Sequence, residues 1–321
     1  MGVVQNRKWF FAVSFLLVVG SIVSLAIPPA LQPGIDFTGG VALEVAFQGE
    51  TSTDEVTEVL HGLGHTDAII QSMGDNRFFI RLGELTRDQR DEEGQVTEPG
   101  EETEVRDALA SIGGDMESLE TVSGVVGAEN VRNAIIAVLI ASVAILAYVT
   151  WAFRKIPSPF RYGASAIFAL VHDVVIILGL FSILGKTINL EVNSMFITGI
   201  LLVIGYSVND TIVVFDRLRE NVLKYVGAPM NELVALSIRE SLPRSLNTSI
   251  TLLVVVAALI LFAGESLRPL LYVAAAGVVV GTYSSIFTAG LTLVSWDNGE
   301  LGKLFAWWPF RKRRPVAAPT R

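Results

Sequence analysis

Six long apolar runs dominate this sequence and decide what kind of fold it can adopt. An α-helix needs about 20 apolar residues to cross the roughly 30 Å hydrocarbon core of a bilayer, and every run has about that length. The runs cover residues 9–27, 133–153, 162–184, 193–215, 246–263 and 269–294. The sequence therefore predicts an α-helical polytopic membrane protein with six transmembrane helices.

The composition supports a membrane protein and excludes several other classes. Only 17% of the 321 residues are charged, whereas ordinary soluble domains carry about 25%, so a soluble globular enzyme and a disordered protein are excluded. The chain has no cysteine, which rules out a disulfide framework, a thiolate metal site and a cysteine nucleophile. Its three histidines, His61, His65 and His172, are too few to favour a zinc site. We therefore expect no metal.

The first apolar run has two readings. Arg7 and Lys8 precede it and Pro28 and Pro29 follow it, as in a cleaved signal peptide. The apolar core of a signal peptide has roughly 7–15 residues, and the run 9–27 is longer. Its length favours an uncleaved first transmembrane helix.

Lysine and arginine near the span ends predict the orientation in the membrane. With the N-terminus inside, the inside segments carry 16 of the 24 Lys and Arg residues, and the two short outside loops contribute only Lys186 and Arg268. Both termini are therefore expected in the cytoplasm. Trp307 and Trp308, followed by the basic run 311–314, are typical of an anchor at the membrane interface.

This orientation predicts four parts. Residues 1–27 form the cytoplasmic N-terminus and first span, and residues 28–131 an extracytoplasmic domain. Residues 132–295 form the other five spans with a cytoplasmic loop at 216–245, and residues 296–321 a basic cytoplasmic tail.

The inserted domain, residues 28–131, has an α+β pattern. Strands are expected at 41–47, 68–73, 77–82 and 118–126 and helices at 55–63 and 101–112, with a flexible polar loop at 86–100. The order β-α-β-β-α-β predicts a ferredoxin-like unit. The domain carries 22 acidic residues and 5 arginines, and its sequence shows no cluster with catalytic or metal-ligand spacing. A solvated cap that only aids folding therefore remains as good an interpretation as a functional domain.

Three ionisable side chains lie inside the predicted spans: His172, Asp173 and Asp210. A charge at the centre of a bilayer costs at least about 2.5–3.5 kcal/mol, so each needs a reason. Asp210 is surrounded in sequence by Ser207, Asn209 and Thr211. That stretch is expected to face a partner helix or a water-filled cavity.

Arg244 begins the fifth span, and Asn247 extends a polar stripe one turn later. If the fourth and fifth spans pack antiparallel, Asp210 and Arg244 lie at matching depths and can pair. A proton on Asp210 would release the guanidinium, because a neutral carboxyl no longer holds it. This pattern predicts a proton relay with a conformational readout. A static ion pair that fixes helix packing stays open as the alternative.

The remaining features inside or beside the spans are less specific. His172 and Asp173 point about 100° apart on a helix, so we expect that they do not share a face, and packing and proton transfer remain equally good roles for them. Gly277 and Gly281 form a GxxxG pattern, a surface for close helix approach. Residues 231–242 suggest a short helix at the cytoplasmic interface.

Three motifs resemble those of a known family. Segment 34–40 reads Gly-Ile-Asp-Phe-Thr-Gly-Gly, segment 205–221 contains Asn-Asp-Thr at 209–211, and segment 244–249 reads Arg-Ser-Leu-Asn-Thr-Ser. The motif residues that match are Gly34, Asp36, Phe37, Thr38, Gly39, Gly40, Asp216 and Arg217. With six spans and one large first loop, the chain closely resembles the SecF family of bacterial protein-export membrane proteins.

The resemblance implies a function and partners. SecF pairs with the related SecD in a pseudo-symmetric twelve-span unit of the resistance-nodulation-division (RND) type, so this chain would be an RND-type half. The unit associates with the SecYEG channel and often with YajC in the bacterial cell inner membrane. It uses proton flow to pull or retain the translocating preprotein after SecA has driven early translocation.

The resemblance also implies site residues. The family's proton-pathway aspartate and arginine match Asp210 and Arg244. The predicted pathway further includes Asn209, Asn247, Asp173 and His172. Protons are the expected coupling ion, with no cofactor and no nucleic acid.

Two other classes remain for comparison. A proton-driven small-molecule exporter of the same superfamily would require a homo-oligomer, because this chain has only six spans. An intramembrane hydrolase lacks support, since the sequence contains no GxSxG or HExxH motif and no GxxxxGK[ST] nucleotide loop. We therefore expect no enzymatic activity.

Overall fold

The computed structural model of this protein describes residues 2–86, 89–90, 96–264 and 267–300. Within them, six helices are long and apolar enough to cross a membrane, which confirms the predicted number of spans. They are α2 (Arg7–Ala26), α6 (Gly124–Ala152), α7 (Pro159–Ile188), α8 (Ser194–Lys224), α9 (Met230–Phe262) and a sixth, Arg268–Asp297, built from α10 (Arg268–Tyr283), a π-helical segment η2 (Ser284–Ala289) and α11 (Gly290–Asp297). A short helix, α1 (Gly2–Gln5), precedes them.

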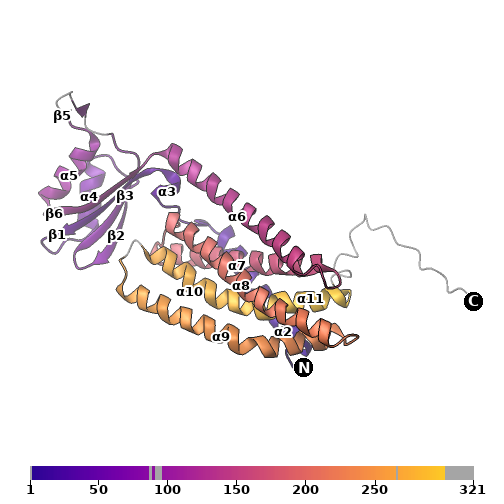
Figure 1. Ribbon diagram of the computed structural model, residues 1–321. Helices are drawn as coiled ribbons and strands as arrows, with labels where there is room; N and C mark the ends of the chain where they lie inside the picture. The colour runs from indigo at the N-terminus through magenta and orange to yellow at the C-terminus, as the bar shows by residue number, and fades with distance from the viewer. Residues whose placement is uncertain (1, 87–88, 91–95, 265–266, 301–321) are drawn as a thin grey trace, which may run out of the picture.

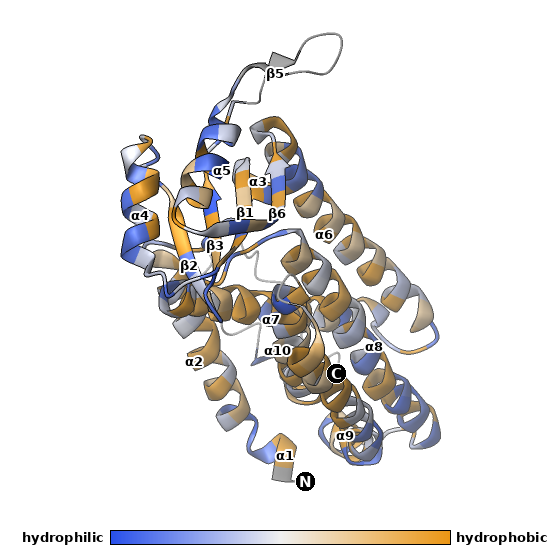
Figure 2. Cartoon of the chain, turned by 90° about the vertical axis from the view of Figure 1, so that its left-hand side faces the viewer, coloured by the Kyte–Doolittle hydropathy of each residue, from blue (hydrophilic) through white to orange (hydrophobic). Residues whose placement is uncertain are grey.

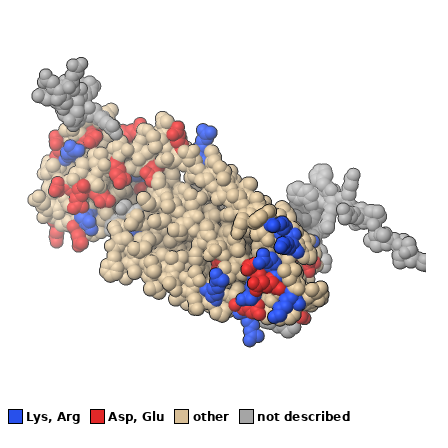
Figure 3. All heavy atoms as spheres, in the orientation of Figure 1, with Lys and Arg blue, Asp and Glu red and all other residues tan. Residues whose placement is uncertain are grey.

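The long helices pack into one bundle with a small α+β domain at one end (Figure 1). The N-terminus lies at the opposite end, where Arg7 Nη2 is 2.5 Å from Glu300 Oε1. Charged side chains gather at both ends of the molecule, and the visible face between them is largely uncharged (Figure 3). Apolar residues cover much of the long helices (Figure 2), as expected of a bundle that faces lipid.

Several helices extend beyond the apolar runs. α6 begins at Gly124, well before the expected start of the second span at residue 133. α8 continues to Lys224 and α9 begins at Met230, so the expected loop 216–245 shrinks to residues 225–229. The separate interfacial helix expected at 231–242 is the first part of α9. Hydropathy marks only the part of a helix that lies in lipid, and it cannot see helical turns that continue into water.

The α+β domain contains the predicted elements in the predicted order. They are β1 (Gly40–Phe47), α4 (Thr53–Gly62), β2 (Ile69–Gly74), β3 (Arg77–Leu82), α5 (Glu101–Ser111) and β6 (Gly114–Val122). The sheet order is β2-β3-β1-β6, with antiparallel neighbours throughout. Alternate residues of the strands pack with apolar residues of α4 and α5 in one core: Val41, Leu43, Val45, Phe47, Val56, Leu60, Phe78, Ile80, Leu82, Val105 and Leu109.

Local chemistry explains the ends of these elements. Ser52 Oγ accepts the Glu55 N–H at 3.2 Å and caps α4. Asp75 and Asn76 both have positive φ, 50° and 55°, as the two central residues of a tight β-hairpin require. The expected start of the last strand at residue 118 is wrong, because β6 begins at Gly114. The irregular register of β6 against β1 near Glu44 breaks the alternation of apolar residues, which hides the start of the strand.

Two elements of the domain were not expected. A short helix, α3 (Ile35–Thr38), precedes β1. Within the stretch 86–100, expected as a flexible loop, β4 (Gln89–Arg90) pairs with β5 (Val96–Glu98). The rest of that stretch is only partly described. The predicted Trp307–Trp308 anchor and all of the tail from residue 301 lie outside the described residues.

The GxxxG pattern brings two helices of this chain into close contact. A Cβ atom on Gly277 of α10 would lie 2.0 Å from Val203 Cγ2 of α8, and one on Gly281 would lie 3.1 Å from Ser207 Cβ. The small residues therefore allow α10 to approach α8, so the pattern needs no partner protein to explain it.

We expect Gly277→Ala to destabilise the bundle, because the added methyl group overlaps Val203. Overpacking of this kind costs about 1–3 kcal/mol. The midpoint of thermal unfolding in detergent should fall relative to wild type. Gly20→Ala on α2 is the matched control, since apart from its own helix backbone no described residue lies within 4 Å of its added Cβ. Equal midpoints for the two variants would contradict the packing described here.

Candidate functional site

Asp210 is a buried carboxylate inside the fourth span. It lies on α8 with 6% of its surface exposed. Its Oδ1 accepts a hydrogen bond from Ser245 Oγ of α9 at 2.6 Å. Its Oδ2 has no hydrogen-bond partner in the described part of the chain. A buried carboxyl group with one free oxygen can take up a proton without first breaking another bond.

The expected ion pair between Asp210 and Arg244 does not form in this structure: no guanidinium nitrogen of Arg244 lies within 4.0 Å of a carboxylate oxygen of Asp210, and Ser245 is the hydrogen-bond partner of that carboxylate. Adjacent residues on a helix point about 100° apart. On α9 the buried Ser245 faces Asp210, whereas Arg244 is exposed. The helices are antiparallel neighbours as expected, but the neighbouring serine takes the position expected for the arginine.

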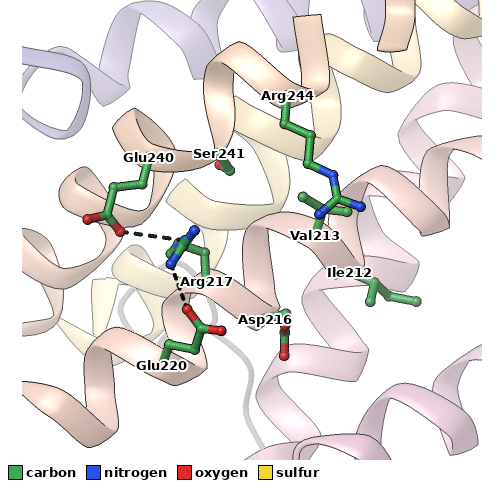
Figure 4. A pocket seen from close by; sticks show the side chains of 8 residues that line it. All are labelled: Ile212, Val213, Asp216, Arg217, Glu220, Glu240, Ser241 and Arg244. Atoms are coloured by element: carbon green, nitrogen blue, oxygen red, sulfur yellow. Dashed lines mark hydrogen bonds and ion pairs between the residues drawn. The ribbon is translucent and has the colours of Figure 1, made fainter. Parts of the chain in front are cut away.

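Arg244 instead lines a cleft of about 330 Å³ between α8 and α9 (Figure 4). The other lining residues are Ile212, Val213, Asp216, Arg217, Glu220, Glu240 and Ser241. Arg217 Nη1 lies 2.7 Å from Glu220 Oε2, and its Nε lies 3.6 Å from Glu240 Oε2 of α9. The family-motif residues Asp216 and Arg217 therefore share this charged cleft with Arg244.

The two predicted pathway asparagines do not reach Asp210. Asn209 and Asn247 are exposed on the outer faces of α8 and α9. In this chain they lie beside the site on the surface of the bundle, and the structure describes no hydrogen bond from either side chain.

Asp173 lies at the centre of a second buried polar cluster. It is 1% exposed, and its Oδ2 accepts hydrogen bonds from Ser207 Oγ of α8 at 2.6 Å and Ser284 Oγ of η2 at 2.7 Å. Its Oδ1 lies 3.0 Å from His172 Nδ1. The expectation that His172 and Asp173 do not share a face is wrong, because the side chains of these adjacent residues are long enough to turn toward each other.

Hydroxyl groups lie between the two carboxylates. Ser285 Oγ donates to the Ser207 carbonyl at 3.0 Å and is 2.8 Å from Thr211 Oγ1, next to Asp210. One turn along α9 from Ser245, Ser249 Oγ lies 2.6 Å from Thr282 Oγ1 and 2.8 Å from the Tyr206 hydroxyl. The bonds around Asp173 join α7, α8 and η2, and a separate group of bonds around Asp210 joins α8, α9 and α10.

Most of these serines are not among the site residues predicted from the sequence. Their spacing in the sequence could have predicted the serines of α9. Ser237, Ser241, Ser245 and Ser249 recur every four residues, and all four are buried. Ser284 and Ser285 gave a weaker signal. They lie in the π-helical segment η2, a local geometry frequent at functional sites, which a regular helical pattern does not predict.

The glycine-rich family motif forms the junction between the domain and the bundle. The Gly34 N–H donates to the Val192 carbonyl at 2.8 Å, and Asp36 Oδ2 accepts the Ser194 N–H at 2.7 Å. Gly39 and Gly40 have φ of +75° and +121°, a region that favours glycine. Added Cβ atoms would lie 2.6 Å from Gly124 N and 2.4 Å from Leu82 O respectively.

The remaining motif residues pack and brace this junction. Thr38 Oγ1 donates to the carbonyls of Gly34 and Gly39 at 3.2 and 3.0 Å. The backbone of Phe37 lies against α6, where a Cβ on Gly127 would be 2.9 Å from the Phe37 carbonyl. The motif thus folds α3 closely onto the start of α6.

An ion pair completes the junction. Arg81 Nη1 of β3 lies 3.1 Å from Glu191 Oε1 and also donates to the Pro33 carbonyl. Burial raises the pKa of the Glu191 carboxyl; the Arg81 guanidinium opposes that rise and the Asp36 carboxylate adds to it.

Comparison with known proteins decides the family. Residues 104–299 match the family model described as protein export membrane protein SecD/SecF, C-terminal. The chain belongs to the SecD/SecF family. Its SecF relatives match over almost their whole length. SecF of Thermobaculum terrenum is 37% identical, with 99% of both chains covered, and SecF of Anaerolinea thermophila is 36% identical, with 99% and 100% covered.

Two solved structures that are similar to this chain belong to longer proteins. The crystal structure of SecDF from Thermus thermophilus, described as translocon-associated, is 31% identical with a TM-score of 0.77 and covers 93% of this chain. A SecDF structure in a super-membrane-facing form is 30% identical with a TM-score of 0.62 and covers 95%. The chain spans about two fifths of each, 39%. The resemblance and the helical fold are confirmed, and the chain is a multi-pass membrane protein.

We expect Ser245→Ala to destabilise this SecD/SecF-family protein, because Asp210 loses a hydrogen-bond donor. An unsatisfied buried group costs about 1–3 kcal/mol, so the thermal unfolding midpoint should fall. Thr248→Ala is the control, since within the described residues the exposed Thr248 hydroxyl donates to the Arg244 carbonyl of its own helix and to no other helix. In the double variant Ser245→Ala/Asp210→Asn, the loss of stability should be smaller than the sum of the losses in the two single variants. Strict additivity would contradict the contact.

The stability of the fold should depend on pH through Glu191 at the junction. Because the pKa of Glu191 is raised in the fold, the native state holds its proton more tightly than the unfolded chain. The stability it contributes is present at low pH and is lost as pH rises from about 4.5 through the folded pKa. Glu191→Gln removes this titration, so its unfolding midpoint should rise relative to wild type as pH increases. The same change at exposed Glu117 is the control. A pH-independent difference would contradict the prediction.

Proposed function

We propose that this chain is the SecF-type subunit of a SecDF protein-export complex. In this role it uses the proton motive force to promote late steps of Sec-dependent translocation across the bacterial inner membrane. Relatives named protein translocase subunit SecF, aligned over nearly their full length, support the export role. The observation that carries the proton role is Asp210, a carboxylate buried within a span with one oxygen free.

The mechanism rests on competition for the Asp210 carboxyl group. When it is ionised, it attracts the Arg244 guanidinium from the neighbouring cleft. When it carries a proton, it has no charge to hold the guanidinium, which remains in the cleft, and Ser245 alone bonds the carboxyl. Because Arg244 is part of α9, its position couples the protonation of Asp210 to that helix.

The available energy is sufficient for such a switch. One proton that crosses a potential of 100 mV releases about 2.3 kcal/mol. Since about 1.4 kcal/mol is a factor of ten, this biases a two-state movement by roughly fiftyfold. Nucleotide chemistry is not needed on this chain, so we infer that it is not an enzyme and that protons are its coupling ion, without a cofactor.

His172 and Asp173 extend the proposed pathway deeper into the bundle. The hydroxyls of Ser207 and Ser285 lie between Asp173 and the turn that holds Asp210, and hydroxyl groups can both accept and donate a proton. Asn209 and Asn247 would border the pathway from the outer faces of α8 and α9, where a second subunit can cover them.

SecD is the proposed partner at that surface. In Bacillus subtilis, a relative named SecDF is a single chain, of which this chain covers 38%. We further propose association with SecYEG and YajC, indirect cooperation with SecA, and action on the translocating preprotein. No role with nucleic acid is proposed.

The proposed orientation puts both termini in the cytoplasm and the α+β domain outside. The start of α2 and residue Glu300 lie at the end of the bundle opposite the domain, which supports this assignment. The charged cleft with Arg244 lies near the same end and would open to the cytoplasm.

The alternative, a proton-driven small-molecule exporter that acts as a homo-oligomer, gains no support. Such an exporter needs an apolar pocket for its substrate. Two cavities in the described residues instead have several charged side chains in their linings: the cleft of Arg244 and a smaller one beside Arg81, Asp67 and Glu84.

The decisive test is completion of Sec-dependent export in cells depleted of their own SecF and supplied with this chain at equal membrane levels. Asp210→Asn should stall export late and abolish its stimulation by the proton motive force, and Arg244→Met should do likewise. Asp54→Asn, on the exposed first turn of α4, is the control for the substitution itself.

Normal export by Asp210→Asn would overturn the proton role and leave the carboxylate a structural group. Failure of both variants to accumulate in the membrane would instead favour the static packing role.

A further inference from the structure

Asp36 joins three parts of the molecule at one residue. Its carboxylate Oδ2 accepts the N–H of Ser194, the first residue of α8, at 2.7 Å. Its backbone carbonyl accepts from Asn130 Nδ2 of α6 at 3.1 Å. α3, which contains Asp36, leads directly through Gly39 and Gly40 into β1 of the domain. One side chain therefore connects the α+β domain to the helix that carries Asp210.

The bond between Asp36 and α8 has favourable chemistry. A carboxylate that accepts a backbone N–H forms a charge-assisted bond, stronger than a neutral one, and a negative charge is stabilised at a helix N-terminus. The helix's own cap does not supply this bond, because Asn193 Oδ1 accepts the Phe196 N–H instead. Asp36 bonds an N–H that the local sequence leaves available.

The domain side of this connection is held by several bonds. Residues 32–34 and 192 exchange backbone hydrogen bonds, with Val192 N–H to Gln32 O at 2.7 Å and Gly34 N–H to Val192 O at 2.8 Å. Arg81 of β3 pairs with Glu191 at 3.1 Å. Strand β3, the segment that contains α3 and the first turn of α8 thus form one bonded unit, so a displacement of the sheet acts directly on α8.

α8 can carry that displacement along its length. It is one continuous helix of 31 residues, and Asp210 lies sixteen residues after Ser194, about 24 Å along the axis. The far end of the same helix forms the cleft with Arg244.

We propose that Asp36 is a positioning residue that docks α8 onto the extracytoplasmic domain, so that a change of protonation at Asp210 moves the domain. The inference rests on the proposed role of Asp210 as the proton-binding group. It gives the glycine-rich motif a mechanical function: the glycines bring α3 close to α6 and β3, and the carboxylate holds α8.

The test uses the absence of cysteine in this chain. Two introduced cysteines, Glu58→Cys on α4 and Val226→Cys at the far end of the bundle, both exposed, carry spin labels in proteoliposomes that also contain a cysteine-free partner subunit. Pulsed electron paramagnetic resonance measures the distance between them. Asp210→Asn, which imitates the protonated carboxyl, should shift the distance distribution.

In a chain that also carries Asp36→Ala, Asp210→Asn should no longer shift the distance. Loss of a charge-assisted bond changes the ratio of docked to undocked α8 by about tenfold or more. Asp36→Asn, which keeps an acceptor but no charge, should reduce the shift, and it also serves if the alanine variant does not accumulate. Asp36→Glu tests rescue by a carboxylate. Asp107→Ala, exposed on α5, is the control and should leave the shift unchanged.

The proposal would be overturned if Asp210→Asn shifted the distance as much in the Asp36→Ala or Asp36→Asn chain as it does in the chain with Asp36. The absence of any shift in Asp210→Asn when that variant has lost proton-driven export would also overturn it, because the proton role would survive without this coupling. Normal export by Asp210→Asn would instead refute the proposed function itself. The two failures are therefore distinguishable.

Discussion

The packing of this bundle depends on the free-energy cost of a buried polar group that has no hydrogen-bond partner inside the bilayer. Two carboxylates, Asp173 and Asp210, are buried within the spans, and in the described residues neither forms an ion pair with a lysine or arginine. Serine hydroxyls donate hydrogen bonds to them instead. A hydroxyl is short, so it can act as a donor only where two helices approach closely, and the packing of small residues between α8 and its neighbours is therefore a condition for burying these acids.

The two carboxylates differ in how completely they are satisfied. Asp173 has two serine donors and a histidine contact, whereas Asp210 has one serine donor and one free oxygen. Complete satisfaction favours a fixed group, and incomplete satisfaction favours one that changes its proton or its partner. This contrast supports Asp210 as the group that changes its proton or its partner. It supports Asp173 as a group that stabilises the surrounding helices or receives a proton from Asp210.

The sequence predicted what depends on local pattern. The six spans follow from run length, and the hairpin at Asp75 and Asn76 follows from turn chemistry. It identified Asp210 because a charge inside an apolar run is costly. It did not predict that Ser245 rather than Arg244 faces Asp210, since the rotation of α9 about its axis is set by tertiary packing. The contact between Asp36 and Ser194 was equally inaccessible, because 158 positions separate the two residues and no local pattern encodes their distance.

The serine stripe on α9 has one member that behaves differently. Ser237, Ser241 and Ser249 each donate to the carbonyl four residues earlier in their own helix, whereas Ser245 donates to Asp210. The carbonyl of Ser241 is therefore a second acceptor within reach of the same hydroxyl by rotation about a single bond. If Arg244 takes over the carboxylate, Ser245 can turn back to its own helix and leave no buried hydroxyl unpaired. The Ser245 hydroxyl then has an acceptor in both arrangements of the site.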